Sequence, residues 1–379
     1  MSIIRRWARL LVHYSVGVQP GWKVEIRGNP LGEPLLKEVY REVLKAGGFP
    51  HMKLGMEALT PLLIGEGSDE QIGYQWPTDR EEAKEIDARI SIGSSGNPRL
   101  LAGLPSDKVA LLRKASEPLM EITFDRTNKG EFTWVGTLFP TEAQAKEAGM
   151  SLPEFEEFIT KAGHLDEEDP VLFWRQFGRA QEQLAQVLNK GKEIHFLAPD
   201  TDLKMSVLGR TWIPCSGTLN FPDGEVFSAP IEESVEGEIR YRFPTLYQGV
   251  LVEDIRLKFS SGVVVDAQAA KGEEHLLALL DLDEGARTVG EVAIGTNYAI
   301  QRHTKNILFD EKIGGTIHLA LGRGYPQTGS RNLSALHWDM VLDMRQGGRI
   351  LLDGETIHEN GLFTIPNLNL PGMPSQPSR

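Results

Sequence analysis

The segment Glu311–Tyr325 reads EKIGGTIHLALGRGY, and its central part, Thr316–Leu321, alternates small or polar residues with bulky apolar ones. Alternation of this kind predicts a β-strand, because successive side chains of a strand point to opposite faces of its sheet. His318 therefore points to one face, and the leucines beside it point to the other. The pattern predicts a sheet with one apolar face and one face that presents functional polar side chains.

Three other segments offer side chains of the same kind. NFPDGEV supplies Glu225, GEVAIGTN supplies Glu291, and SALHWDM supplies His337 and Asp339. The last two residues are two positions apart, so a strand would point both the same way. Carboxylate and imidazole ligands without a thiolate suit zinc, manganese, cobalt or iron(II). Three carboxylates and two histidines exceed what one catalytic zinc normally uses, and two ions sharing a carboxylate would use them all.

Composition narrows the class of protein. A chain of 379 residues is long enough for two domains, and its net charge of −13 argues against nucleic acid as the main partner. The single cysteine, Cys215, excludes an intrachain disulfide and a thiolate zinc knuckle, and we expect it to be a small buried residue. No apolar run reaches transmembrane length, so we expect a cytoplasmic protein that binds no membrane.

The N-terminal half alternates expected strands with expected helices, which favours an α/β domain with a mostly parallel sheet. The loop GSSGNP, Gly93–Pro98, follows a strand but matches no nucleotide-binding motif, so it predicts a simple strand-to-helix connection. Ile122–Phe124 has strand-type composition. Pro170 begins a long amphipathic helix that ends near Gly191.

Beyond this helix the chain is expected to be strand-rich. Short β-type segments separated by turns predict an α+β catalytic domain, with one clear helix at Lys271–Leu280. We therefore expect an N-terminal α/β domain over residues 1–195, a metal-binding catalytic domain over 196–363, and a mobile tail over 364–379 that is rich in proline and serine.

The motifs PDGEV, GEVAIGTN, EKIGGTIHLALGRGY and SALHWDM together resemble the aminopeptidase T family, which includes the enzymes called AmpS and PepS. The resemblance is strong over Asn220–Asp339 and looser over the N-terminal half. It implies a homodimeric two-metal exopeptidase of broad specificity, using zinc, cobalt or manganese on peptides with a free N-terminus. Its metal positions fall on Glu225, Glu291, His318, Tyr325, His337 and Asp339.

Several roles stay open at this point. Activated water would attack the scissile carbonyl, and either Glu225 or Glu291 would accept its proton. Tyr325 would bind a metal or donate to the oxyanion. Asp223 and Lys312 lie beside ligand segments and could orient ligands or bind the substrate, but for both a surface ion pair is the favoured interpretation.

Two other functions remain as alternatives. One is a ring-cleaving dioxygenase of the dihydroxypyridine type, which holds a single iron(II) with fewer ligands. The other is a non-catalytic protein that binds a metal or a peptide. The presence of both glutamates favours two ions and hydrolysis over the dioxygenase.

Overall fold

The protein is described here by a computed structural model, in which residues 2–375 are placed. The chain forms two compact units. The first comprises the residues up to Val171 and a short later segment, Gly217–Pro222. The second comprises Leu172–Ser216 and the chain from Asp223 onward. The division predicted from the sequence, at residue 195 with a tail from 364, stays a prediction, and the last four residues of that tail lie outside the described part.

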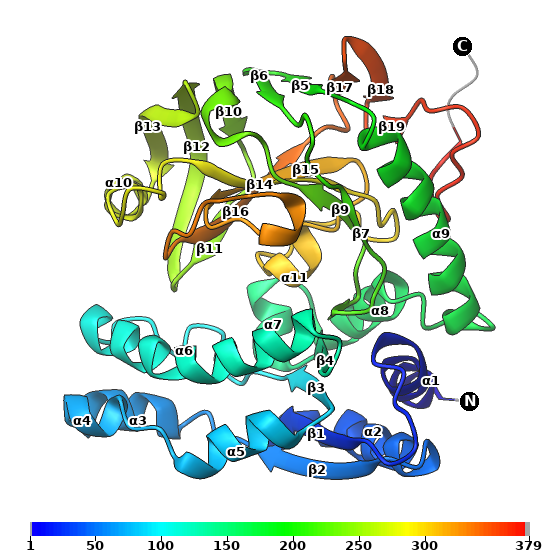
Figure 1. Ribbon diagram of the computed structural model, residues 1–379, viewed down its shortest axis with the longest axis vertical. Helices are drawn as coiled ribbons and strands as arrows, with labels where there is room; N and C mark the ends of the chain where they lie inside the picture. The colour runs from blue at the N-terminus through cyan, green and yellow to red at the C-terminus, as the bar shows by residue number, and fades with distance from the viewer. Residues whose placement is uncertain (1, 376–379) are drawn as a thin grey trace. The chain divides into compact units, whose positions relative to one another are not determined.

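The first unit is built on a five-stranded sheet whose neighbouring strands are all parallel (Figure 1). Its strands are β1 (Lys23–Gly28), β2 (Phe49–Leu54), β3 (Ala88–Gly93), β4 (Thr133–Leu138) and β8 (Asn220–Phe221). Their order in the sheet is β2-β1-β3-β4-β8, in which the fifth strand is the segment that returns to this unit late in the chain.

Helices connect these parallel strands. Local sequence explains several of their ends: Ser151 and Glu154, for example, form a reciprocal capping box at the start of α8. The first helix continues into a π-helical turn at Leu11–Ser15. The helices are α1 (Ile3–Leu10), α2 (Glu33–Lys45), α3 (Leu59–Glu66), α4 (Asp69–Ile72), α5 (Pro77–Glu85), α6 (Ser106–Asn128), α7 (Glu142–Glu147) and α8 (Leu152–Ala162).

Two local expectations meet different outcomes here. Ile122–Phe124 was expected as a strand but lies within helix α6, because three residues of high β propensity do not outweigh the cooperative extension of a long helix. The loop Gly93–Pro98 connects β3 with α6, as expected. The backbone N–H of Gly96, a group that a phosphate would need, donates instead to the carboxylate of Glu57 at 2.9 Å.

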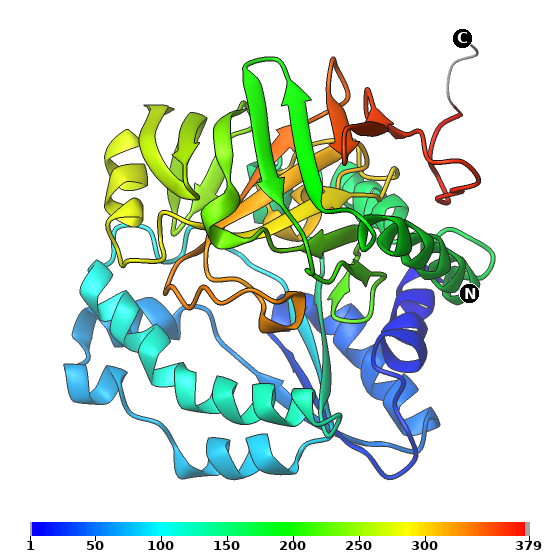
Figure 2. The same cartoon turned by 45° about the horizontal axis from the view of Figure 1, so that its top comes forward.

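The second unit contains a nine-stranded antiparallel sheet, whose long β5–β6 hairpin is drawn in green in Figure 2. Its strands are β5 (Glu193–Ala198), β6 (Thr201–Ser206), β10 (Glu236–Tyr241), β11 (Thr245–Tyr247), β12 (Val250–Ser260), β13 (Val263–Lys271), β17 (Arg349–Leu352), β18 (Glu355–Glu359) and β19 (Leu362–Phe363). The sheet order is β11-β12-β10-β6-β5-β17-β18-β19, and β13 pairs with β12.

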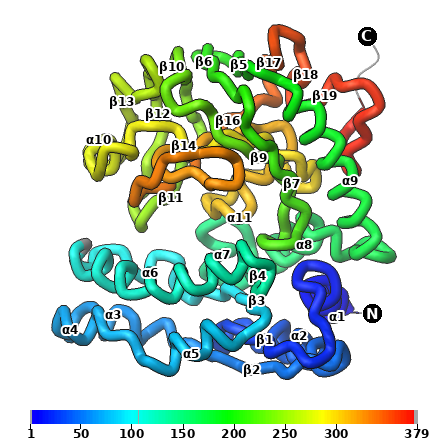
Figure 3. The backbone as a smooth tube through the Cα atoms, viewed as in Figure 1, coloured from blue at the N-terminus to red at the C-terminus, as the bar shows by residue number. Residues whose placement is uncertain are grey.

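A second antiparallel sheet of five strands lies in the same unit. Its strands are β7 (Ile213–Cys215), β9 (Glu225–Ser228), β14 (Val289–Gly295), β15 (Thr316–Gly322) and β16 (His337–Asp343), in the order β16-β15-β14-β9-β7. Figure 3 traces the long connection from β15 to β16, in orange. The helices of this unit are α9 (Pro170–Leu188), α10 (Glu273–Leu280) and α11 (Ile307–Asp310).

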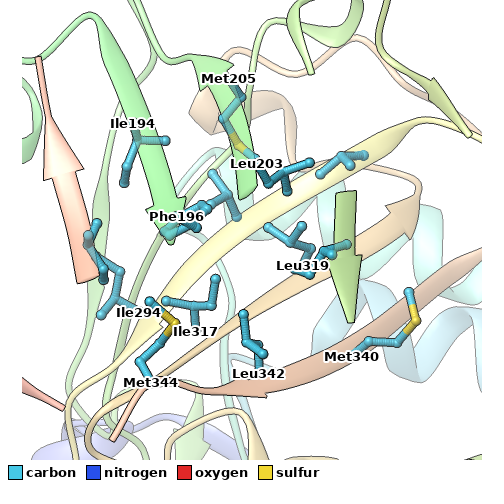
Figure 4. Close-up of a cluster of buried hydrophobic side chains, with 14 of the residues drawn as sticks. Ile194, Phe196, Leu203, Met205, Ile294, Ile317, Leu319, Met340, Leu342 and Met344 are labelled. Atoms are coloured by element: carbon cyan, nitrogen blue, oxygen red, sulfur yellow. The ribbon is translucent and has the colours of Figure 1, made fainter. Parts of the chain in front are cut away.

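The core of the second unit lies between its two sheets. Phe196 and Leu203 of the larger sheet face Ile317 and Leu319 of the smaller one, and all four are completely buried (Figure 4). Burial of this much apolar surface holds the five strands in one register.

The predicted fold class is confirmed: an α/β unit with a parallel sheet comes first, and a strand-rich unit of antiparallel sheets follows. Within residues 2–375, none of the helices combines the length and the apolar character needed to cross a membrane.

Candidate metal centre

One face of the five-stranded sheet carries the predicted ligands. The strand register places Glu225 opposite Gly295, His318 opposite Ala293, and Asp339 opposite Ala320. Paired residues share a face, so small side chains stand between the large polar ones. The register thus places small residues in the middle of the sheet and ligand-type side chains around them.

The distances show how tightly these side chains converge. The Nε2 atom of His318 lies 3.2 Å from Oε2 of Glu225 and 3.4 Å from Oε1 of Glu291. The Nε2 atom of His337 lies 3.7 Å from Oε2 of Glu291 and 3.3 Å from Oδ2 of Asp339. Glu291 therefore directs one oxygen toward each histidine.

Two groups of ligand-type atoms result, each lying within 4.8 Å, and Glu291 belongs to both. The first contains Glu225, Glu291 and His318, and the second contains Glu291, His337 and Asp339. The structure thus brings together five of the six residues predicted from sequence.

Sequence reasoning missed a further carboxylate, that of Glu311. It forms a group of its own with His318 and Asp339, and its Oε2 lies 3.7 Å from Nε2 of His318. Glu311 follows α11 in a loop, so no strand periodicity pointed to it. The signal available was its position as the first residue of the EKIGGTIH motif.

Tyr325 lies on the connection between β15 and β16, at the margin of the cluster. Its ring packs edge-on against Phe227 and against His337, with both centroids at 5.4 Å. Burial and the nearby carboxylates, that of Glu291 first, raise the pKa of the Tyr325 hydroxyl. The side chain retains 40% exposure, so it borders both the cluster and solvent.

The buried donor atoms fit a divalent cation. Among the described residues, Oε2 of Glu225, Oδ1 of Asp339 and both ring nitrogens of His318 are buried without a hydrogen-bond partner, since even their close approaches lack hydrogen-bond geometry. Such atoms are costly to bury unless something compensates them. A metal ion accepts electron pairs from carboxylate oxygen and imidazole nitrogen alike.

The backbone also prepares His337 for coordination. Its Nδ1 lies 2.8 Å from the carbonyl oxygen of Arg323. Because a carbonyl only accepts, Nδ1 carries the proton in this contact and Nε2 is left to face the carboxylates. A hydrogen bond of this kind fixes both the tautomer and the ring orientation of a metal-binding histidine.

The positions of Lys312 and Asp223 differ from the expectation. Both were interpreted as surface ion pairs, yet Lys312 is fully buried and Asp223 is 2% exposed. The ammonium of Lys312 lies 2.6 Å from Oε1 of Glu311 and 3.2 Å from Oε1 of Glu225. Lys312 lies in the loop between α11 and β15, where no strand or helix period reveals the direction of a side chain.

The electrostatics of the cluster reflect crowded negative charge. Burial favours the neutral form of Glu225, but Lys312 and His318 together outweigh it and keep the pKa of this carboxyl below its ordinary value. Burial, only partly offset by Lys312, raises the pKa of Glu311 to about 8. Burial works against the charged form of His337, yet Asp339, Glu291 and the carbonyl of Arg323 together outweigh it and raise the pKa of the imidazole to about 10. The cluster stabilises positive charge.

Comparison with known proteins identifies the class. A family model described as thermophilic metalloprotease (M29) matches residues 2–363. Aminopeptidase T of Thermus thermophilus is 32% identical over 281 residues, which cover 69% of this chain and 69% of that protein. The solved structure of wild-type AmpT from Thermus thermophilus matches with a TM-score of 0.84 at 25% identity, covering 96% of this chain and 99% of that one.

A second solved structure shares the fold alone. The 2,5-dihydroxypyridine dioxygenase of Pseudomonas putida KT2440 matches with a TM-score of 0.61 at 12% identity, over 97% of this chain and 99% of that one.

The family match and the carboxylate–imidazole cluster together define a metallopeptidase. The chain belongs to the M29 family, the group that its motifs resemble. The predicted enzyme class, a metallo-aminopeptidase, is confirmed with it.

Proposed function

We propose that this enzyme releases N-terminal residues from peptides with two divalent ions held by Glu225, Glu291, His318, His337 and Asp339. One observation carries the proposal: two groups of ligand-type atoms share a single carboxylate, that of Glu291. A shared carboxylate is the feature that distinguishes a two-metal centre from two unrelated sites.

The two groups suggest which residue holds which ion. Glu225 and His318 would bind one ion, His337 and Asp339 the other, and Glu291 would bridge them with one oxygen each. Zinc, cobalt and manganese all accept this set of oxygen and nitrogen ligands. When bound, such ions polarise the scissile carbonyl and lower the pKa of a water molecule to near neutrality.

Glu311 is the better general base. The two glutamates that the sequence suggested for this role are committed to the ions in the present assignment. Glu311 is oriented by Lys312 through one oxygen, at 2.6 Å, and keeps its other oxygen directed into the cluster. It accepts the proton of the attacking water and delivers it to the leaving amine.

Tyr325 is assigned as a hydrogen-bond donor to the oxyanion rather than as a ligand. A phenol is protonated at neutral pH and so carries a hydrogen to donate. Its ring is held between Phe227 and His337 at the margin of the cluster, where a substrate carbonyl would lie.

The substrate is a peptide with a free N-terminus and varied first residues. This part of the proposal rests on the family resemblance and on the named relative, Aminopeptidase T.

The test combines metal content with activity. The purified enzyme is stripped with a chelator, and zinc, cobalt or manganese is titrated back while hydrolysis of leucine p-nitroanilide is followed. N-acetyl-leucine p-nitroanilide is the matched control. We expect activity to saturate near two ions per chain and to be absent with the blocked amine.

Other outcomes would redirect the assignment. Saturation at one ion without amide hydrolysis, accompanied by oxygen uptake with iron(II), would replace the proposal by ring cleavage. Binding of two ions without turnover on any free-amine substrate would indicate a binding protein.

We also propose a cytoplasmic homodimer, on the resemblance to the aminopeptidase T family. Light scattering of the purified chain measures the assembly, and a mass equal to one chain at working concentration would refute it. Cell fractionation with antibody detection measures the location.

A further inference from the structure

Lys312 binds no ion in the assignment above, yet its side chain is almost completely buried. Among the described residues it is the only buried lysine, with no exposed surface. Its ammonium donates to Glu311 at 2.6 Å and lies 3.2 Å from Glu225. A buried ammonium is costly to desolvate, so a lysine kept here indicates a role for its charge.

The surroundings of Glu225 show what that charge faces. Cys215, Asp223 and Glu225 form another group of ligand-type atoms within 4.8 Å of one another. Strand register explains it, since Cys215 is paired with Glu225 and so lies on the ligand face of the sheet. The charge of Lys312 acts on Asp223 and on the Cys215 thiol as well as on Glu225. The ammonium of Lys312 thus supplies the positive charge next to Cys215, Asp223 and Glu225.

Charge counting supports the same conclusion. Five carboxylates gather here, three of them buried and those of Glu311 and Asp339 nearly so: Asp223, Glu225, Glu291, Glu311 and Asp339. Two divalent ions with neutral histidines would neutralise all but one of them. The ammonium of Lys312 supplies the remaining positive charge, so the filled centre with Lys312 is electrically balanced.

We propose that Lys312 is a built-in counter-ion. Its ammonium occupies a third cation position, between Glu311 and the group formed by Cys215, Asp223 and Glu225, and so limits the centre to two metal ions. It is a positioning residue: it orients one oxygen of Glu225 and one of Glu311 and leaves their other oxygens for the ions and the water. This inference rests on the two-metal centre of the proposed function.

A metal ion bound in place of the Lys312 ammonium would disturb the two-metal centre. Cys215, Asp223 and Glu225 offer one sulfur and two carboxylates, a set of ligands that zinc and cobalt accept. An ion bound there would draw Glu225 away from its partner His318. The ammonium of Lys312 prevents this because it binds Oε1 of Glu225 and repels a divalent cation.

The test is a cobalt titration of the stripped enzyme, read by metal analysis and by the near-ultraviolet absorption of thiolate-to-cobalt charge transfer. The wild type is compared with Lys312→Met and with the double variant Lys312→Met/Cys215→Ser. We expect the wild type to bind two ions without the thiolate band. Lys312→Met gains a third ion and the band, and the double variant loses both.

The kinetics should change with the ion count. Loss of a partner that orients metal-site residues typically costs about 10–100-fold in metal affinity or activity. We expect a loss of this size in kcat for Lys312→Met, with KM changing little because the lysine does not contact substrate.

Three results would overturn the inference. They are a thiolate band in the wild type at saturating cobalt, two ions without a band in Lys312→Met, and a band that persists in the double variant. Lys312→Gln replaces Lys312→Met if the latter does not fold. A wild type that binds fewer than two ions would instead refute the two-metal function, so the two failures are distinguishable.

Discussion

The two faces of the five-stranded sheet differ in almost every physical respect, although the same strands build both. On β15, Ile317 and Leu319 enter the core, while His318 between them joins the cluster of ligand-type side chains. The apolar face is stabilised by burial and packing. The ligand face gathers charges that repel one another, and so costs stability in the absence of a cation.

The difference between the faces shows how a site that lowers the stability of the fold is held in position. Each strand is held by its apolar side chains, so the polar side chains on the other side have no freedom to move apart. Rigid strands with small residues between them, such as Ala293 and Ala320, set the spacing of the ligands. Stability and function are thus divided between the faces, and each face can be altered separately.

The largest effect should follow from changing the shared carboxylate. In the proposed two-metal centre, Glu291→Gln removes the bridge between the ions, and with it several kcal/mol of transition-state stabilisation. We expect kcat on leucine p-nitroanilide to fall by about three orders of magnitude. Metal analysis should find at most one ion per chain.

The matched control for this substitution is Glu284→Gln, in the loop before β14. It removes the same charge from an exposed position and should leave both readings near the wild type. A Glu291→Gln enzyme that retains two ions and most of its activity would contradict the bridging role.

On the opposite face, Leu319→Ala should act on stability alone. Leu319 is completely buried between the sheets, and truncation of such a leucine costs about 2–5 kcal/mol. Urea unfolding measures the loss. Activity per folded molecule should stay near the wild-type value at low temperature, and a large fall in kcat of the folded enzyme would show that the faces are not independent.

The neighbouring residue gives the converse experiment. Ala320 follows Leu319 but lies on the ligand face, paired with Asp339 and Glu291. Ala320→Leu fills the space between them, and a displacement of about 1 Å at a reacting centre can cost on the order of 100-fold in rate. We expect kcat to fall by about that factor. An unchanged kcat with a lowered melting temperature would contradict the assignment of faces.

The smallest effect concerns a histidine placed among apolar groups instead of carboxylates. His358 of β18 is fully buried, and burial lowers its pKa to about 4. Since the unfolded value is about 6.5, the unfolded chain binds the proton more tightly, and stability falls as the pH drops from 6.5 toward 4. The contribution lost by pH 5 is about 2 kcal/mol.

The measurement compares urea unfolding of the wild type and His358→Phe at pH 8 and pH 5. The variant should gain about 2 kcal/mol relative to the wild type between these values. A constant difference between the two proteins would mean that the imidazole does not stay neutral in the fold.

Local pattern was sufficient for much of the molecule. The alternation around His318 predicted both the strand and its two faces, and the H-x-D spacing placed His337 beside Asp339. It was insufficient for Glu311 and Lys312, which lie in a loop where side-chain direction follows no period. It also failed at Ile122–Phe124, where a long helix overrode local preference.

The sequence by itself determined the fold class, because strand periodicity is a local property of the chain. The family and the residue types of the site came from the resemblance of its motifs, which are equally local. Only the tertiary structure decided which carboxylate lies between the two histidines and that a lysine is buried among the acids. These facts depend on strand order and loop path, which bring together residues as distant along the chain as Glu225 and Asp339.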